Sequence, residues 1–209
     1  MIEIEKRILI DKEKYDEMLT FLTKNGKLKQ TFKRFTMVSN TNPDFIPETK
    51  GKEDLRVRTT GETGKLTMKY GDWHADAARE EYEVGFKTDE IKELLNILRI
   101  QQYLYYIITY IQRFHYTYDG YEITLDKYYS SDIALMEVEI SVNEQQKVQA
   151  AEKRIDEFLA KYDLTPLDSE GMIKFITGVN NVKSNQIDFA KISIDAWYDE
   201  WKDFIYCRK

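Results

Sequence analysis

The first residues of the chain alternate charged and apolar side chains in the pattern of a β-strand. Residues 2–10 place Glu3, Glu5 and Arg7 at every second position, with isoleucines between and around them. Successive side chains of a strand point to opposite faces, so the two carboxylates and the guanidinium share one face. The sequence therefore predicts a strand with one charged face and one apolar face.

Pairs of like-charged residues, two positions apart, recur along the chain. After the first pair come Arg56 and Arg58, Glu81 and Glu83, and Glu137 and Glu139. One such pair is typical of a solvated sheet face. Four pairs favour a closed sheet, in which the charged faces line a polar interior and the apolar faces meet covering helices. A charged interior of this kind requires a bound ligand whose charges complement those of the lining residues.

Length and composition agree with one domain of this type. The 209 residues, 42% of them apolar, suit a large all-β or α+β domain with a substantial core. No stretch approaches the ~18 apolar residues of a membrane span. The single cysteine, Cys207, excludes an internal disulfide framework, and the two histidines, His74 and His115, disfavour a zinc site. The net charge of −6 disfavours non-specific binding of nucleic acid. We expect a cytoplasmic protein with no nucleic-acid or membrane partner.

Turn signals divide the chain into eight predicted strands. They cover residues 2–10, 31–38, 55–60, 65–70, 79–86, 104–117, 121–127 and 135–142. Asp119-Gly120 is the strongest hairpin signal, because both residues tolerate positive φ. Eight is an even number and can close an antiparallel barrel. The predicted fold is α+β, an eight-stranded antiparallel β-barrel with helices packed outside.

Caps and apolar stripes predict the helices. They cover residues 11–25, 88–98, 143–162, 169–177 and 184 to about 206. Trp197 and Trp201, four residues apart, are expected to dock the last helix on the domain. We expect the barrel domain to occupy residues 1–178 and a helical extension, packed on the same domain, to occupy 179–209. The best linker candidate is 179–185.

The predicted inward faces carry both signs of charge. The acids are Glu3, Glu5, Glu81, Glu83, Asp126, Glu137 and Glu139. The bases are Arg7, Arg56, Arg58, Lys69, Arg79 and Arg113. Like charges in a low-dielectric cavity are costly unless each sign has a partner. A polyphosphate would satisfy the bases and divalent cations the acids, and phosphoryl transfer requires both.

These residues also resemble the motifs of a known family. Glu3-Ile-Glu5-Lys-Arg7 is similar to the amino-terminal E-x-E-x-K signature of the CYTH, or triphosphate tunnel metalloenzyme, superfamily. The other matches follow in family order within residues 1 to about 178: Leu55-Arg56-Val57-Arg58, Leu66-Thr-Met-Lys69, Arg79-Glu-Glu81-Tyr-Glu83, Arg113, Leu125-Asp126 and Glu137-Val-Glu139. The resemblance implies an eight-stranded tunnel. It also implies hydrolysis of inorganic tripolyphosphate or thiamine triphosphate, or cyclisation of ATP to cyclic AMP.

The resemblance assigns roles to individual residues. It implies that Mg²⁺ or Mn²⁺ is gathered by Glu3, Glu5, Glu137 and Glu139, with Asp126 nearby. The implied phosphate ligands are Arg7, Arg56, Arg58, Lys69, Arg79 and Arg113. Lys174 matches the place of a family lysine that closes over the tunnel mouth. In a hydrolase, Glu81 or Glu83 would orient the attacking water.

Two departures from the family pattern bear on substrate choice and turnover. Arg7 stands where the family usually has lysine, and Ile111 stands where many members have one. His115 either donates to a phosphate or is a satisfied residue of the barrel wall. We favour a metal-dependent triphosphate hydrolase over an adenylate cyclase and over a sensor that binds a nucleotide or polyphosphate without turnover. The sequence leaves the choice between monomer and homodimer open.

Overall fold

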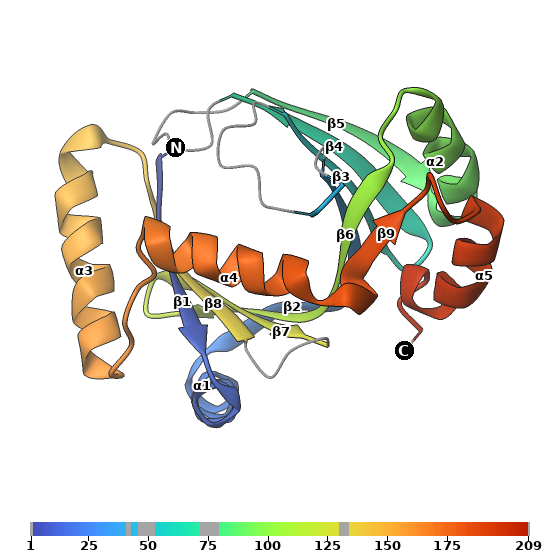
Figure 1. The fold of residues 1–209 in the computed structure, drawn as a ribbon. Helices are drawn as coiled ribbons and strands as arrows, with labels where there is room; N and C mark the ends of the chain where they lie inside the picture. Colours follow the sequence, from blue (N-terminus) through green and yellow to red (C-terminus); the bar gives the residue numbers. More distant parts are fainter. Residues whose placement is uncertain (1, 41–42, 46–52, 72–79, 130–133, 209) are drawn as a thin grey trace. The chain divides into compact units, whose positions relative to one another are not determined.

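The structure, a computed structural model, describes residues 2–40, 43–45, 53–71, 80–129 and 134–208 (Figure 1). One predicted phosphate ligand, Arg79, lies outside these residues. Within them, no helix is both long and apolar enough to cross a membrane.

All eight predicted strands are present in one antiparallel sheet. They are β1 (Ile2–Ile10), β2 (Lys27–Asn40), β3 (Glu53–Thr60), β4 (Thr63–Tyr70), β5 (Glu80–Lys87), β6 (Tyr105–Tyr118), β7 (Tyr121–Tyr128) and β8 (Ala134–Val142). Their order in the sheet is β1-β8-β7-β6-β2-β3-β4-β5, and a short ninth strand, β9 (Gln186–Asp188), pairs with β6. In the part of the chain described, no ladder joins β1 to β5, so backbone hydrogen bonds do not close the sheet. The predicted α+β fold with an eight-stranded antiparallel sheet is confirmed.

The chain forms two compact units. The first comprises residues 1–32 and 111–171, and the second comprises 33–110 and 172–209. The helices are α1 (Lys12–Asn25) and α3 (Val148–Lys161) in the first unit, and α2 (Ile91–Ile100) and α5 (Ile194–Ile205) in the second. Most of a further helix, α4 (Ser169–Asn181), belongs to the second unit. The predicted boundary between residues 178 and 179 stays a prediction.

The core of the first unit is formed by the apolar face of its sheet. Ile4 and Ile8 alternate with the charged residues of β1 and are buried with Ile123 and Val138. Helices α1 and α3 cover this face, and α3 lies beside β1 in Figure 1. The sequence signals hold here. Asp11 caps α1 by accepting a 2.8 Å hydrogen bond from the Lys14 amide, and Asp119-Gly120 turns with positive φ at both residues.

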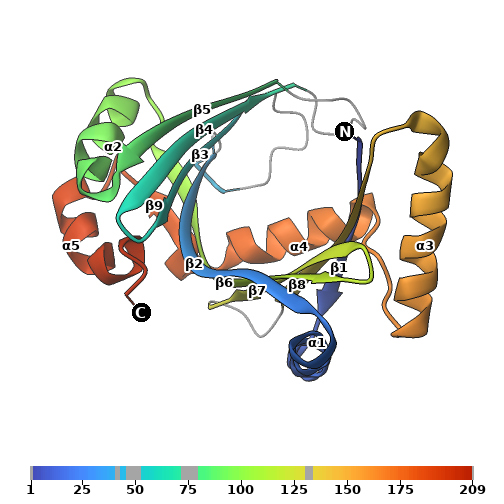
Figure 2. The same cartoon turned by 180° about the vertical axis from the view of Figure 1, so that it is seen from behind.

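The core of the second unit joins the sheet to α2 and α5. Phe35, Met37 and Val57 are fully buried on the apolar faces of β2 and β3. Trp197 is 2% exposed and packs against Phe35, as expected for a docking residue. Figure 2 shows β2 to β5 side by side, with α2 and α5 together at one end of this group.

The predicted start of the last helix is wrong. Residues 186–188 form β9, paired with β6 through Tyr106 and Ile187, and α5 begins only at Ile194. Ser193 caps that helix by accepting a 3.1 Å hydrogen bond from the Ala196 amide, because a hydroxyl at this position satisfies a free helix amide. The expected linker 179–185 also contains the end of α4 and the buried Asn180, whose side-chain amide donates to the Phe45 carbonyl at 3.1 Å.

Candidate functional site

Strand register places the charged residues of the first unit on one side of its sheet. Arg7 lies opposite Glu137, and Glu137 lies opposite Thr124. Glu5 lies opposite Glu139 in the same way. Residues directly opposite each other in antiparallel strands share a face. We call this surface the acidic face; its charged residues are Glu3, Glu5, Arg7, Arg113, Glu122, Asp126, Glu137 and Glu139.

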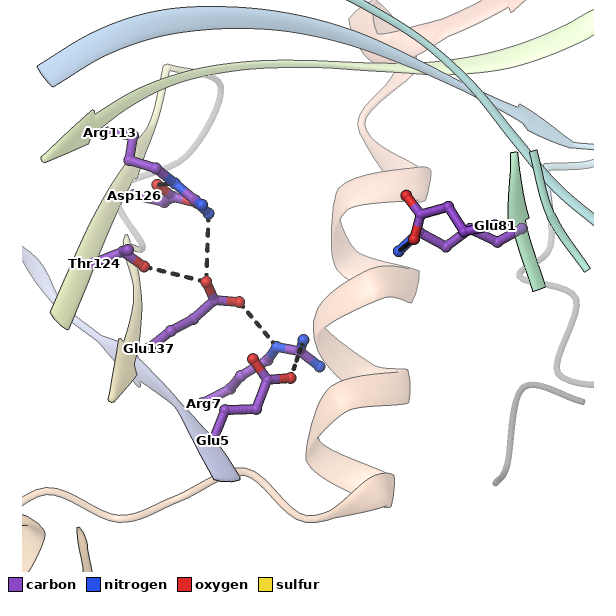
Figure 3. Close-up of polar contacts among 8 residues, drawn as sticks. Glu5, Arg7, Glu81, Arg113, Thr124, Asp126 and Glu137 are labelled. Atoms are coloured by element: carbon purple, nitrogen blue, oxygen red, sulfur yellow. Dashed lines mark hydrogen bonds and ion pairs between the residues drawn. The ribbon is translucent and has the colours of Figure 1, made fainter. Parts of the chain in front are cut away.

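Glu137 is the centre of the acidic face (Figure 3). Its carboxylate accepts hydrogen bonds from Arg7 Nε at 3.0 Å, from Thr124 Oγ1 at 3.1 Å and from Arg113 Nη2 at 3.4 Å. Burial by itself would raise the pKa of Glu137, but the charges of Arg113 and Arg7 outweigh burial and lower it. Glu137 is therefore held ionised by two residues that the sequence assigned to phosphate binding.

Arg113 and Asp126 form a second ion pair on this face. Arg113 Nε donates to Asp126 Oδ1 at 2.6 Å, and Nη2 bonds the other carboxylate oxygen. Asp126 is only 3% exposed. Burial lowers the pKa of Arg113, but its hydrogen bond to Asp126 and the charges of Asp126 and Glu137 together outweigh burial, and the pKa rises. A predicted phosphate ligand is thus bonded to a predicted metal ligand.

Two other carboxylates of the face repel their neighbours. Burial raises the pKa of Glu5, and the charges of Glu137, Glu139 and Glu3 add to the rise, although Arg7 opposes it. The pKa of Glu139 is also raised, first by burial and then by Glu3, Glu122 and Glu137, against a hydrogen bond from Ser141. Crowded carboxylates of this kind are stabilised by a bound cation.

The acidic face fits a divalent ion by its chemistry. Carboxylate oxygens are the ligands that Mg²⁺ and Mn²⁺ prefer, and the repulsion around Glu5 and Glu139 would be relieved by a bound cation. Among the residues described, no three His, Cys, Asp or Glu side chains are arranged to hold a metal ion. Two carboxylates of this face, Glu5 and Glu137, are bonded to the guanidinium of Arg7.

Sequence reasoning missed Glu122 on this face. Its two carboxylate oxygens contact Lys29 Nζ at 2.9 Å and His115 Nε2 at 2.6 Å. The signal was present, because Glu122, Thr124 and Asp126 alternate along β7. The contact with Glu122 favours the reading of His115 as a satisfied residue of the sheet wall.

The second unit carries a basic face on β3, β4 and β5. Its register forms three rows: Asp54–Lys69–Glu81, Arg56–Thr67–Glu83 and Arg58–Lys65–Gly85. Thr36 on β2 lies opposite Arg58, so Arg34, two residues earlier, belongs to the same face. We call this surface the basic face; its charged residues are Arg34, Asp54, Arg56, Arg58, Lys65, Lys69, Glu81 and Glu83.

Three cations of the basic face are neutralised by neighbouring carboxylates. Arg56 Nε donates to Asp54 at 2.7 Å. Lys69 Nζ lies 2.7 Å from Glu81, whose side chain is labelled in Figure 3, and Lys65 Nζ lies 2.6 Å from Glu83.

Glu83 also accepts a hydrogen bond from Thr67 at 3.2 Å. The bond from Lys65 is the main cause of its lowered pKa, which makes Glu83 a weak proton acceptor.

Arg58 differs from Arg56, Lys65 and Lys69, the three paired bases of this face. Its Nε is buried, and no hydrogen-bond partner for it occurs in the described residues. Burial lowers the pKa of Arg58 to about 10, and the charges of Arg56 and Arg34 contribute to the shift. Sequence reasoning missed Arg34, although Arg34 and Thr36 alternate with the buried Phe35 and Met37 of β2.

The remaining predicted catalytic residue, Lys174, is exposed on α4 in the second unit. The predicted site residues thus fall into two groups. The first unit gathers Glu3, Glu5, Arg7, Arg113, Asp126, Glu137 and Glu139, and the second holds Arg56, Arg58, Lys69, Glu81, Glu83 and Lys174. Ile111, the second departure from the family pattern, is 4% exposed on β6.

Comparison with solved structures finds proteins of the same fold. The PH1819 protein of Pyrococcus horikoshii OT3 is 19% identical, with a TM-score of 0.57 over 84% of this chain and 98% of its own. A candidate adenylate cyclase of Bacillus halodurans is 17% identical, with a TM-score of 0.54 over 83% and 96% of the two chains. A candidate adenylyl cyclase of Hippeastrum, described as having a dominant triphosphatase activity, is 13% identical, with a TM-score of 0.50 over 83% and 96%.

A search of curated protein sequences finds no match. The sequence profile of the CYTH domain matches residues 1–169, which include every predicted site residue except Lys174. The chain therefore belongs to the CYTH domain family.

Proposed function

We propose that this protein is a metal-dependent hydrolase of triphosphates, acting on inorganic tripolyphosphate or on an organic triphosphate such as thiamine triphosphate or a nucleotide. The observation that carries the proposal is the pairing of acids and bases on both faces. Arg7 and Arg113 are bonded to Glu137 and Asp126, and Lys69 is bonded to Glu81. Pairs of this kind are exchangeable, because a polyphosphate can replace the carboxylates around the bases while a divalent cation replaces the bases around the carboxylates.

Arg58 supports the same reading. A buried guanidinium whose pKa is lowered by burial and by neighbouring arginines gains most when an anion binds. Arginine contacts phosphate oxygens through two parallel N–H donors, so a bound phosphate group would also satisfy its Nε.

In the proposed reaction, the basic face holds the triphosphate and stabilises the charge that develops on the transferred phosphoryl group. Glu81 positions the attacking water once Lys69 has turned to the substrate. The bond from Lys65 lowers the pKa of Glu83, so in this proposal Glu83 does not act as the base and instead holds Lys65 in place. Glu3, Glu5, Glu137 and Glu139, with Asp126, would hold Mg²⁺ or Mn²⁺, and the ion would supply Lewis-acid charge.

Product analysis tests this proposal. Purified protein is incubated with tripolyphosphate, ATP or thiamine triphosphate and with Mg²⁺ or Mn²⁺, and orthophosphate and cyclic AMP are both measured. We expect orthophosphate as the product. We expect the E81Q substitution to lower kcat strongly and to change KM much less. Cyclic AMP and pyrophosphate from ATP would instead identify a cyclase, and binding with no product would identify a sensor.

A further inference from the structure

Strand β5 lies at the end of the sheet order and has an unpaired edge (Figure 2). Within the described residues, β4 is its only neighbour in the sheet. Residues 80–85 are all exposed, so side chains on both faces of this strand meet solvent. An edge strand presents a row of free backbone N–H and C=O groups that can pair with another extended chain. β5 therefore offers a place where a further strand can be added.

The face of β5 opposite the basic face is apolar. Tyr82 is 63% exposed and Val84 is 65% exposed. Their neighbours on β4 are also apolar, because Tyr82 lies opposite Met68 and Val84 lies opposite Leu66. Both β4 side chains are half-buried against the core of the second unit. Exposed apolar surface beside a free strand edge is typical of a protein-binding site.

The geometry of strand pairing limits how a second copy of β5 could fit this edge. Two antiparallel copies related by a two-fold axis form an isologous pair. Backbone hydrogen-bonding groups alternate between the two edges of a strand, and side chains alternate between its two faces. Both alternations match across the pair only when one residue stands opposite its own copy. Each possible register is therefore named by its central residue.

Charge selects one of these registers. A pair centred on Tyr82 would place Glu81 opposite Glu83, and a pair centred on Glu83 would place that residue opposite its own copy. Like charges directly opposite each other are destabilising. A pair centred on Gly85 would overlap over fewer residues and would set glycine against glycine. The register centred on Val84 avoids these faults.

In that register the remaining residues are complementary. Tyr82 stands opposite the partner's Phe86, which makes an aromatic cross-strand pair. Glu81 stands opposite the partner's Lys87, which makes a pair of opposite charges. The two-fold axis repeats each pair, so two aromatic pairs and two ion pairs flank the central valines.

We propose that two copies of this chain associate through antiparallel pairing of their β5 strands about Val84, which joins the two sheets into one. The pairing covers the apolar side chains of Tyr82 and Val84 and satisfies the free backbone groups of the edge. This inference rests on strand register, exposure and charge, and it does not depend on the proposed function.

Sedimentation velocity of the full chain, from micromolar to near-millimolar protein, measures the association. The test variants are V84K and V84E, because either substitution brings two like charges opposite each other at the centre of the pair. Val84 is exposed, so both variants are expected to fold. The matched control is I97K, since Ile97 is 60% exposed on α2 of the same unit.

We expect the wild type to dimerise reversibly and each variant at position 84 to dimerise at least about tenfold more weakly. An equimolar mixture of V84K and V84E should form dimers again, because lysine then stands opposite glutamate. I97K should dimerise as the wild type does. A wild type that stays monomeric, a V84K variant that dimerises as well as I97K, or a mixture that stays monomeric would each overturn the proposal.

Discussion

Arg7 Nε donates to Glu137 Oε1 at 3.0 Å across the β1–β8 pair, and Arg7 also bonds Glu5 on its own strand. The residue that replaces the usual family lysine therefore joins two carboxylates with one planar group. A lysine is a single point charge and cannot form both bonds with the same geometry. Arginine at this position, in place of the usual lysine, thus strengthens the bonding between the strands that carry the acidic face.

This relationship predicts the effect of restoring the lysine. R7K should retain triphosphate hydrolysis, because the positive charge remains, but should lose about 1 kcal/mol of unfolding free energy with one hydrogen bond. R7M should lose both activity and stability. Urea denaturation and phosphate release measure the two quantities, and an R7K variant as stable as the wild type would contradict the bridging role.

As the pH rises, Glu139 and Glu137 should change the free energy of unfolding in opposite directions. The pKa of Glu139 is raised on folding above its ordinary value of 4.5, so the folded state holds its proton more tightly. Its contribution to stability is full below pH 4.5 and is lost as the pH rises through the raised pKa. E139Q should therefore be more stable than the wild type at pH 7, with the difference vanishing by about pH 4.

Glu137 shows the reverse behaviour. Its pKa is lowered on folding, so its contribution is present above pH 4.5 and is lost as the pH falls through the folded value. E137Q should be less stable than the wild type at pH 7 by about 2 kcal/mol, because three donors lose an ionised acceptor, and the gap should narrow in acid. Urea titrations at pH 4 and pH 7 measure both variants. If E139Q and E137Q both raised or both lowered the stability at pH 7 relative to the wild type, the electrostatic description of the acidic face would be contradicted.

Two neighbouring arginines of β3 should respond differently to substitution. Arg56 bonds Asp54, a buried carboxylate, so R56M should cost about 2 kcal/mol of unfolding free energy. R58M removes a charge that burial, Arg56 and Arg34 all disfavour, so it should leave the free protein equally stable or more stable. R58M should also abolish most of the rise in melting temperature that tripolyphosphate causes in the wild type. A strongly destabilised R58M variant would show that Arg58 is a structural partner of a carboxylate.

Metal removal tests the acidic face directly. Phosphate release should stop in EDTA and return with Mg²⁺ or Mn²⁺. E139Q should abolish the metal-dependent turnover while the circular dichroism spectrum stays that of a folded protein. The control is E144Q, since Glu144 follows β8 and is bonded to Lys147 and Gln146. Turnover that survives chelation would remove the metal assignment.

The alternation of charged and apolar residues by itself determined which side chains share a face of each strand. Ile4 and Ile8 are buried and Glu3, Glu5 and Arg7 are not, because the two-residue period of a strand is a local property of the backbone. The same local chemistry placed the turn at Asp119-Gly120 and the cap at Asp11. These features depend on neighbours in sequence, and the sequence was sufficient to predict them.

Only the tertiary structure decided which acid meets which base. The pairs Arg7–Glu137 and Arg113–Asp126, and the roles of Arg34 and Glu122, follow from the register between strands that are distant in sequence. Register is set by the packing of whole apolar faces against their helices, and a shift of one residue would exchange every partner. The start of α5 was missed for a related reason, since residues 186–188 become a strand only because β6 offers an edge for pairing.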